Sequence, residues 1–250
     1  VPALVAVGIY LLKSKKNSNP VLRSIRGSLV NSAVQKLSAL VPESGGFLEA
    51  IPLTAFVSMC LIRSGFEKNE VAEKGIVFLY RQQREDGSWP IDTDLSTWVT
   101  TLAVKALGSR LKQDLPDEFI EKVRSHLLNL QYKTNHPFNG AKPGGWRWTS
   151  YPGSVPDADD TPGAILALLE LYKGSEEEDR AIISGCNWLV NLQNSDGGIP
   201  TFCKGWGRLP FDRSCSDLTG HALLSITKAM EVLKEKITPR QKSSFERSAK

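Results

Sequence analysis

The stretch SGCNWLVNLQNSDGGI at residues 184–199 closes one helix and then turns on glycine. Residues 74–89, KGIVFLYRQQREDGSW, match it position for position, with Trp89 where Ile199 stands. A pattern that returns along a chain is typical of repeat architectures, in which each unit covers the apolar face of its neighbour. The fold is therefore predicted to consist of repeated helical units.

Two further copies extend the repeat. A third copy begins at residues 127–131 and resumes after an insertion at residues 144–146, and a degenerate copy ends at residues 45–47. The anchor residues of the copies are 42, 57 and 53 residues apart, in the order Phe47, Trp89, Trp146 and Ile199. Each interval has room for two helices and their loops.

Apolar and amphipathic helices are expected to alternate along the chain. The apolar helices follow the anchors, at roughly 53–63, 97–107, 162–172 and 218–233. The amphipathic helices precede the anchors, at roughly 70–82, 117–131 and 177–193. An apolar helix needs cover on all sides, and an amphipathic helix supplies it. The pattern predicts an all-α fold, an α/α barrel (toroid) of inner and outer helices, and no convincing strand is found.

The loop KPGGWRWTSYPGSVPDADDTP at residues 142–162 places three carboxylates within four positions, directly before an apolar helix. Asp157, Asp159 and Asp160 cannot all ionise at low cost, because like charges raise one another's pKa. At least one of them is expected to keep a proton at neutral pH, which makes the cluster a candidate general acid. The alternative is an ordinary helix start, with Asp160 or Thr161 as the N-cap.

Composition and charge exclude several classes of protein. A hydrophobic content of 41% and a charged content of 23% are those of a folded globular protein. The net charge of +4 is modest and the basic residues are scattered, apart from a group at residues 13–16, so nucleic-acid binding has little support. None of the four cysteines shows CxxC spacing, and Cys60 and Cys186 are expected to be buried thiols.

The ends of the chain suggest a piece of a longer protein. The chain opens in an apolar run of twelve residues, too few to span a bilayer, and it closes at the start of another expected outer helix. We expect residues 1–250 to be part of one α/α-barrel domain, with residues 1–44 as a helical lead-in and residues 45–250 as repeat units. We expect this fragment alone to be inactive.

At the repeat and the acid loop, the chain resembles the squalene-hopene cyclase family of class II terpene cyclases. The repeat is similar to the family's QW motif, and the acid loop is similar to its Pro-Asp-x-Asp-Asp-Thr signature. Residues 209–211 and 217–221 also resemble the family segment downstream of the acid motif. The resemblance covers most of residues 45–250 and implies an α/α-barrel domain that is half of a two-barrel enzyme.

The resemblance implies roles for individual residues. Asp159 matches the proton donor, and Asp157 and Asp160 match its supporting acids. Arg208 departs from the family pattern, because it stands where the family commonly places a histidine that hydrogen-bonds the donor. It is a candidate partner of the acid, and the alternative is that its side chain points to solvent. Aromatic side chains at the expected mouth of the barrel are candidates for stabilising carbocations, with core packing as the alternative for each: Trp98, Trp146, Trp148, Trp206 and Phe211.

The implied activity is a metal-independent isomerase, an intramolecular transferase that cyclises squalene or a related linear polyprenoid in triterpenoid or hopanoid biosynthesis. No cofactor is expected, and the group Cys215, Asp217 and His221 has poor spacing for zinc. The expected partners are the isoprenoid substrate and a membrane surface, which the protein would contact as a peripheral or monotopic protein on the cytoplasmic face. No nucleic acid is expected, and a homodimer is one assembly that the resemblance allows.

Two alternatives remain open. The chain could cyclise a different isoprenoid by the same chemistry. It could also be an α/α barrel that keeps the repeat but binds a lipid or a protein without turnover. The three clustered Asp residues favour an enzyme, because a binding barrel has no need of them.

Overall fold

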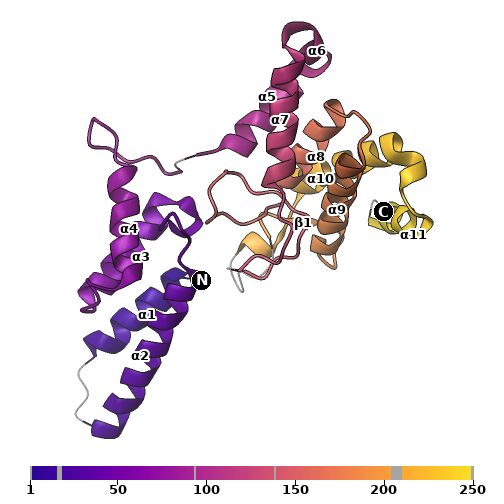
Figure 1. Cartoon of the computed structure of the whole chain (residues 1–250). Helices are drawn as coiled ribbons and strands as arrows, with labels where there is room; N and C mark the ends of the chain where they lie inside the picture. The colour runs from indigo at the N-terminus through magenta and orange to yellow at the C-terminus, as the bar shows by residue number, and fades with distance from the viewer. Residues whose placement is uncertain (1, 16–18, 93, 138, 204–209, 249–250) are drawn as a thin grey trace. The chain divides into compact units, whose positions relative to one another are not determined.

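The computed structural model describes residues 2–15, 19–92, 94–137, 139–203 and 210–248 (Figure 1). The described residues are mostly helical, which confirms the prediction of an all-α fold. They form two compact units, Val1–Asp94 with Tyr151–Ser154 (unit 1) and Leu95–Ser150 with Val155–Lys250 (unit 2). The prediction of one partial domain over residues 1–250 stays a prediction.

Unit 1 is built from four helices and a short 3₁₀ segment, η1 (Phe47–Glu49). Helix α1 packs against both α2 and α3, and α3 packs against α4. The apolar core of the unit includes Ile9, Leu37 and Leu61, all essentially inaccessible to solvent. The bounds of the helices are α1 (Pro2–Ser14), α2 (Pro20–Leu40), α3 (Ile51–Arg63) and α4 (Glu70–Arg81).

Unit 2 has two layers of helices. In the inner layer, α8 (Asp160–Glu170) packs between α5 (Ser96–Leu107) and α10 (Ser216–Leu233). In the outer layer, α7 (Asp117–Leu130) and α9 (Glu176–Leu192) both contact α8. The remaining elements are η2 (Gly108–Arg110), α6 (Leu111–Asp114), η3 (Pro210–Asp212), η4 (Lys234–Lys236), α11 (Pro239–Ser248), and the antiparallel pair of β1 (Ile199–Pro200) and β2 (Ser214–Cys215).

The alternation predicted from the sequence is confirmed in this arrangement. The apolar helices α5, α8 and α10 are the inner ones, and the amphipathic helices α7 and α9 cover them. All predicted helices exist, and the bounds differ by two residues or fewer. One of these differences affects the acid cluster. Helix α8 begins at Asp160 instead of residue 162, so Asp160 lies in the helix.

The repeated Gln has the same task in each copy that carries it. Gln83 donates to the carbonyl of Gly87 at 3.1 Å, and Gln193 donates to the carbonyl of Gly197 at 2.7 Å. Both glycines have a positive φ, +84° and +87°, which side chains rarely adopt. In the third copy, Gln131 reaches across the insertion to the carbonyl of Gly144 at 2.8 Å. The Gln therefore fixes the turn that ends each outer helix.

The repeated Trp satisfies a carbonyl near the end of the preceding helix. Trp89 donates its indole N–H to the carbonyl of Leu79 at 2.8 Å, and Trp146 donates to that of Leu127 at 2.7 Å. The last carbonyls of a helix lack partners within it. The small residue of the repeat lets the ring approach: a Cβ on Gly185 would lie 2.7 Å from the Trp146 ring.

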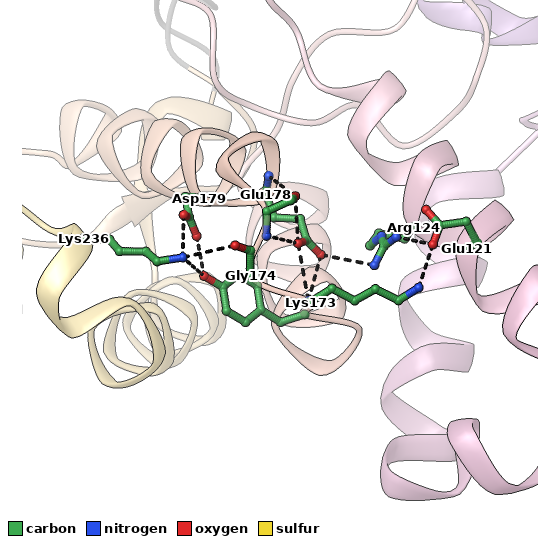
Figure 2. A network of polar contacts seen from close by, with 9 residues as sticks. Glu121, Arg124, Lys173, Gly174, Glu178, Asp179 and Lys236 are labelled. Carbon is green, nitrogen blue, oxygen red and sulfur yellow. Dashed lines mark hydrogen bonds and ion pairs between the residues drawn. The ribbon is translucent and has the colours of Figure 1, made fainter.

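A network of charged side chains joins the outer helices of unit 2 (Figure 2). At its centre, Glu178 is fully buried, closes a capping box with Ser175 at the start of α9, and faces Arg124 of α7 at 3.7 Å. On the other side, Lys236 bonds Asp179 at 2.7 Å and the hydroxyl of Tyr172 at 2.9 Å. The network therefore holds α7, α9 and the segment after α10 around the inner helices.

Candidate active site

Trp146 anchors the loop that carries the acid cluster. Its backbone carbonyl accepts from the N–H of Asp157 at 3.0 Å, and its backbone N–H donates to the hydroxyl of Thr161 at 2.9 Å. Arg147 and Pro156 form a β-bridge beside it. These bonds hold Asp157 and Thr161, and the two acids between them in sequence, against the fully buried Trp146.

Asp157 caps helix α8. One carboxylate oxygen, Oδ1, accepts from the backbone N–H groups of Asp159 at 2.9 Å and Asp160 at 2.8 Å. The N-cap expected at Asp160 or Thr161 is wrong, because the N-cap position is Asp159, whose side chain makes no cap hydrogen bond. The Asp157 carboxylate accepts from the N–H groups at this helix start instead. The second oxygen, Oδ2, is buried and accepts no hydrogen bond from another described residue.

Asp157 and Asp160 form a buried pair of carboxyl groups, each 3% exposed. Burial raises the pKa of Asp157 to about 7, and burial together with the charges of Asp157 and Asp159 raises the pKa of Asp160 to about 10. A hydrogen bond between the two side chains lowers the pKa of Asp157 and raises that of Asp160. The arrangement makes Asp160 the carboxyl group that keeps its proton at neutral pH.

Asp159 points in a different direction from this pair. Its side chain is 33% exposed, and its Oδ1 lies 3.3 Å from Nδ1 of His221 in the second turn of α10. Both residues line a cavity of about 400 Å³ along the inner helices α5, α8 and α10, together with Trp98, Leu102, Leu166 and Leu224. Asp159 is the member of the acid cluster that lines this cavity.

Three aromatic rings form a second group in unit 2. Trp148 meets Phe202 edge to face with centroids 6.0 Å apart, and Phe202 meets Phe211 in the same way at 5.9 Å. Such pairs stabilise one another beyond the burial of their area. Phe211 remains 40% exposed, so this group presents aromatic surface as well as packing internally.

The predicted aromatic residues thus have different places in the structure. Trp98 lines the cavity and Trp148 and Phe211 lie in the three-ring group. Trp146 is fully buried between α7 and α9 and is an anchor of the repeat, which corrects the expectation that it lines the cavity. Trp206 and Arg208 lie outside the described residues.

The comparison with protein families decides the identity of the fold. Residues 95–238 match the model of the squalene-hopene cyclase C-terminal domain, which is more than half of the chain. The chain belongs to the squalene-hopene cyclase family. The match begins just before α5 and contains the acid cluster, His221 and the three-ring group.

Curated relatives agree with the family. A terpene cyclase–glycosyl transferase fusion protein of Humicola fuscoatra is 29% identical over 65% of this chain and 14% of its own length. The squalene–hopene cyclase of Alicyclobacillus acidocaldarius is 31% identical over 57% of this chain and 22% of its own length. The chain thus spans less than a quarter of either relative.

Among solved structures, a type II terpene cyclase from Scytonema with geranylgeranyl dihydroxybenzoate bound as substrate is also similar to the chain. It is 12% identical, with 96% of this chain and 69% of that chain covered, at a TM-score of 0.33.

Sequence reasoning missed two residues of the site. His221 was considered only as a member of a group with poor spacing for zinc, and the structure places it beside Asp159. Phe202 was not singled out, although it follows the anchor Ile199 by three residues, much as Trp148 follows Trp146 by two. Position just after an anchor was the available signal.

Metal ligation has no support in the described part of the chain. No group of three or more His, Cys, Asp or Glu side chains there could hold a metal ion. Cys60, Cys186 and Cys203 are buried free thiols, and Cys215 is partly exposed. The expected burial of Cys60 and Cys186 is confirmed.

We expect the free energy of unfolding to fall as the pH rises from about 5 to about 8. The raised pKa values of Asp157 and Asp160 mean that the folded chain keeps protons that the unfolded chain releases near its ordinary pKa of 3.8. For each proton that only the folded chain keeps, the free energy of unfolding falls by about 1.4 kcal/mol per unit rise in pH. This fall continues to about pH 7 for Asp157 and to about pH 10 for Asp160.

Chemical denaturation at a series of pH values measures this slope. In Asp160→Asn the side chain is neutral at every pH, so the free energy of unfolding should depend less steeply on pH. Asp117→Asn, at the exposed start of α7, should leave this dependence unchanged. Equal slopes in the two variants would show that Asp160 is ionised in the folded chain.

Proposed function

We propose that the chain carries the proton-donating site of a terpene cyclase that acts on a linear polyprenoid, with squalene as the first candidate. The observation that carries the proposal is the placing of Asp159 in a largely apolar cavity, beside His221 and next to a buried carboxyl pair. Protonation of an isolated alkene needs a strong acid in a place from which water is excluded.

The three acids have separate tasks in this proposal. Asp159 donates its proton to the terminal alkene, because it is the acid that lines the cavity. Asp157 holds the loop through its bonds to the backbone N–H groups of Asp159 and Asp160. Asp160 stays neutral, so it adds no negative charge beside the donor, and a charge there would hold the proton on Asp159 more tightly.

The proton balance closes through His221. Protonation of the alkene leaves Asp159 as a carboxylate and the substrate as a tertiary carbocation, whose positive charge moves as the rings form. Loss of a proton, or addition of water, ends the cascade. The imidazole nitrogen at 3.3 Å can accept a hydrogen bond from the protonated Asp159. After the donor has lost its proton to the alkene, the imidazole can take up a proton from water, which receives the one released at the end of the cascade, and pass it to the Asp159 carboxylate.

The exposed aromatic rings would stabilise the carbocations. A cation over an aromatic face gains about 0.5–2 kcal/mol, more when water is excluded. Trp98 lies in the cavity with Asp159, and Trp148, Phe202 and Phe211 form the three-ring group. We propose Phe202 as a member of this set in place of Trp146.

We expect His221→Gln to lower the rate of cyclisation by about 100-fold, because the donor loses its positioning and its proton supply. Initial rates with the full-length protein measure the effect. His126→Gln on α7 is the matched control. An unchanged rate in His221→Gln, with the variant folded, would exclude His221 from the reaction.

A second candidate substrate class has one observation in its favour. Lys105, Glu170 and Lys228 also line the cavity, and none of them forms an ion pair with another described residue. An isoprenoid with an anionic group at its far end would match the two lysines better than squalene does. Incubation of the full-length protein with squalene and with a polyprenoid carboxylic acid, followed by mass spectrometry of the products, distinguishes the two.

We also propose that the protein works at the cytoplasmic face of a membrane, where a linear polyprenoid is dissolved. In the portion that the structure describes, no helix has the length and apolar character of a bilayer-spanning segment. Contact with the membrane would then be peripheral or monotopic. Cell fractionation followed by washing with salt and with detergent tests this proposal, and recovery of all protein in the unwashed supernatant would reject it.

A further inference from the structure

Unit 1 contains a buried glutamate that lies outside the site described above. Glu49 is 1% exposed and ends η1, the short 3₁₀ segment between α2 and α3. Burial of an ionisable side chain is unfavourable unless hydrogen bonds replace those it would form with water. The contacts of this side chain therefore indicate what the fold gains from it.

The Glu49 side chain holds a segment from a distant part of the sequence. Its Oε1 accepts from the hydroxyl of Ser44 at 2.8 Å and from the backbone N–H of Gly153 at 2.7 Å. Gly153 follows Glu49 by 104 residues and belongs to the segment Tyr151–Ser154, which is part of unit 1. The first bond fixes the carboxyl group within its own turn, and the second attaches the segment to it.

The backbone at Glu49 has an unusual conformation. Among the described residues, Leu48 and Glu49 are the non-glycine residues with a positive φ, 53° and 55°. Side chains rarely adopt this left-handed region, and residues held there often occur where function requires a fixed geometry. The N–H of Glu49 also donates to the carbonyl of Gly46 at 3.1 Å. The turn therefore keeps a strained backbone, and this backbone directs the Glu49 side chain to Gly153.

Gly153 is the residue type that this contact requires. A Cβ at this position would lie 2.5 Å from Oε1 of Glu49 and 2.6 Å from the carbonyl oxygen of Gly46. Only glycine permits so close an approach of the backbone. Within the segment, the hydroxyl of Ser154 donates to the carbonyl of Tyr151 at 3.1 Å. The segment is thus packed against the Glu49 turn without room for a further side chain.

The segment leads directly into the acid cluster. Three residues separate Gly153 from Asp157, and two of them restrict the chain: Val155 is fully buried, and the ring of Pro156 fixes its φ. Movement of the segment would therefore displace Asp157. The bonds to Trp146 described above hold the acid loop at one point, and the bond at Gly153 is a second point of attachment.

We propose that Glu49 positions the acid cluster, because it fixes Gly153 and with it the chain that leads to Asp157. Asp157 in turn accepts from the N–H groups of Asp159 and Asp160, so its displacement would loosen both. The inference rests on the proposed function, in which the rate depends on the placing of the donor Asp159. A displacement of about 1 Å at a reacting group can cost about 100-fold in rate.

Hydrogen–deuterium exchange of the full-length protein tests the positioning without a substrate. The backbone N–H groups of Asp157, Asp159 and Asp160 form hydrogen bonds that depend on the position of the loop. In Glu49→Ala these three groups should exchange at least about tenfold faster than in the wild type, because the loop opens more often. The N–H groups of α9 should exchange at wild-type rates.

Steady-state kinetics with the polyprenoid that the full-length wild type cyclises tests the consequence for the reaction. Glu49→Ala should lower kcat at least about tenfold and change KM by less than about twofold, because Glu49 does not line the cavity. Glu49→Gln keeps an oxygen that can accept the same two hydrogen bonds, so its kcat should stay within about threefold of the wild type. Gly153→Ala should lower kcat as Glu49→Ala does, and the double variant should lose little more, because both changes break one contact.

Leu61→Ala is the matched control for a loss of stability. It removes a fully buried side chain from the core of unit 1 and should lower the free energy of unfolding. It should leave kcat and the exchange of the acid loop unchanged. Circular dichroism confirms that each variant is folded.

Three outcomes would overturn the proposal. Equal losses of kcat in Leu61→Ala and Glu49→Ala would give Glu49 a purely structural role, and a loss in Glu49→Gln equal to that in Glu49→Ala would exclude the hydrogen bond as the cause. Unchanged exchange of the acid loop in folded Glu49→Ala would show that Glu49 does not hold it. If the wild type cyclises no polyprenoid, the proposed function is rejected, and the exchange experiment still decides whether Glu49 fixes the loop.

Discussion

Asp159→Asn is expected to abolish cyclisation, with a loss of at least about 10³-fold in rate. The amide has nearly the shape of the carboxyl group but cannot donate a proton to an alkene. Because the Asp159 side chain is partly exposed, and its interactions inside the fold are few, the free energy of unfolding should change by less than about 0.5 kcal/mol. Product analysis of the full-length protein with squalene and other polyprenoids measures the first effect.

The controls for this variant are acids outside the cavity. Asp117→Asn, on the exposed start of α7, should keep full activity. Asp160→Asn should lose activity to a lesser degree, because it removes a neutral carboxyl behind the donor rather than the donor itself. Cyclic product at the wild-type rate from Asp159→Asn would assign the proton to another group and remove the basis of the proposed function.

Trp146→Ala should have the largest effect on stability, a loss of about 3–5 kcal/mol. The ring is fully buried against Gly185, and its indole N–H bonds the carbonyl of Leu127 at 2.7 Å. The change therefore leaves a cavity and an unsatisfied carbonyl near the end of α7. Denaturant unfolding followed by circular dichroism measures the loss.

Trp89→Ala is the matched control, because Trp89 makes the same bond but is 46% exposed. It should cost about 1 kcal/mol. Trp146→Phe keeps most of the buried ring and should lower stability by about 1–2 kcal/mol without changing the products. A change of product in Trp146→Phe, at unchanged stability, would return Trp146 to the wall of the active-site cavity.

The fold was predictable because the repeated residues make local contacts that shape each unit. Gln83 and Gln193 fix glycine turns, Trp89 and Trp146 satisfy helix carbonyls, and small residues admit the rings. Each of these contacts lies within one repeat unit or between neighbouring units. The alternation of apolar and amphipathic helices was equally local, and it predicted the inner and outer layers of unit 2.

The site was less predictable because its contacts cross long stretches of sequence. Asp159 was found because Asp157 and Asp160 stand beside it in the sequence. The different roles of the three acids depend on which of them are buried, and the sequence does not show this. His221 is far from Asp159 in sequence, and only the packing of α10 against α8 brings them to 3.3 Å. The first-turn position of Asp160 depends on a cap from Asp157, whose reach was not foreseen.

The most direct measurement of the central claim follows the proton itself. The full-length protein is incubated with squalene in deuterium oxide, and the product is analysed by mass spectrometry. Transfer of a proton from Asp159 to the alkene predicts a cyclic product that carries a single solvent-derived deuterium at the initiating end, and no such product from Asp159→Asn. A cyclic product without deuterium at that position, or one that Asp159→Asn still forms, would contradict the account.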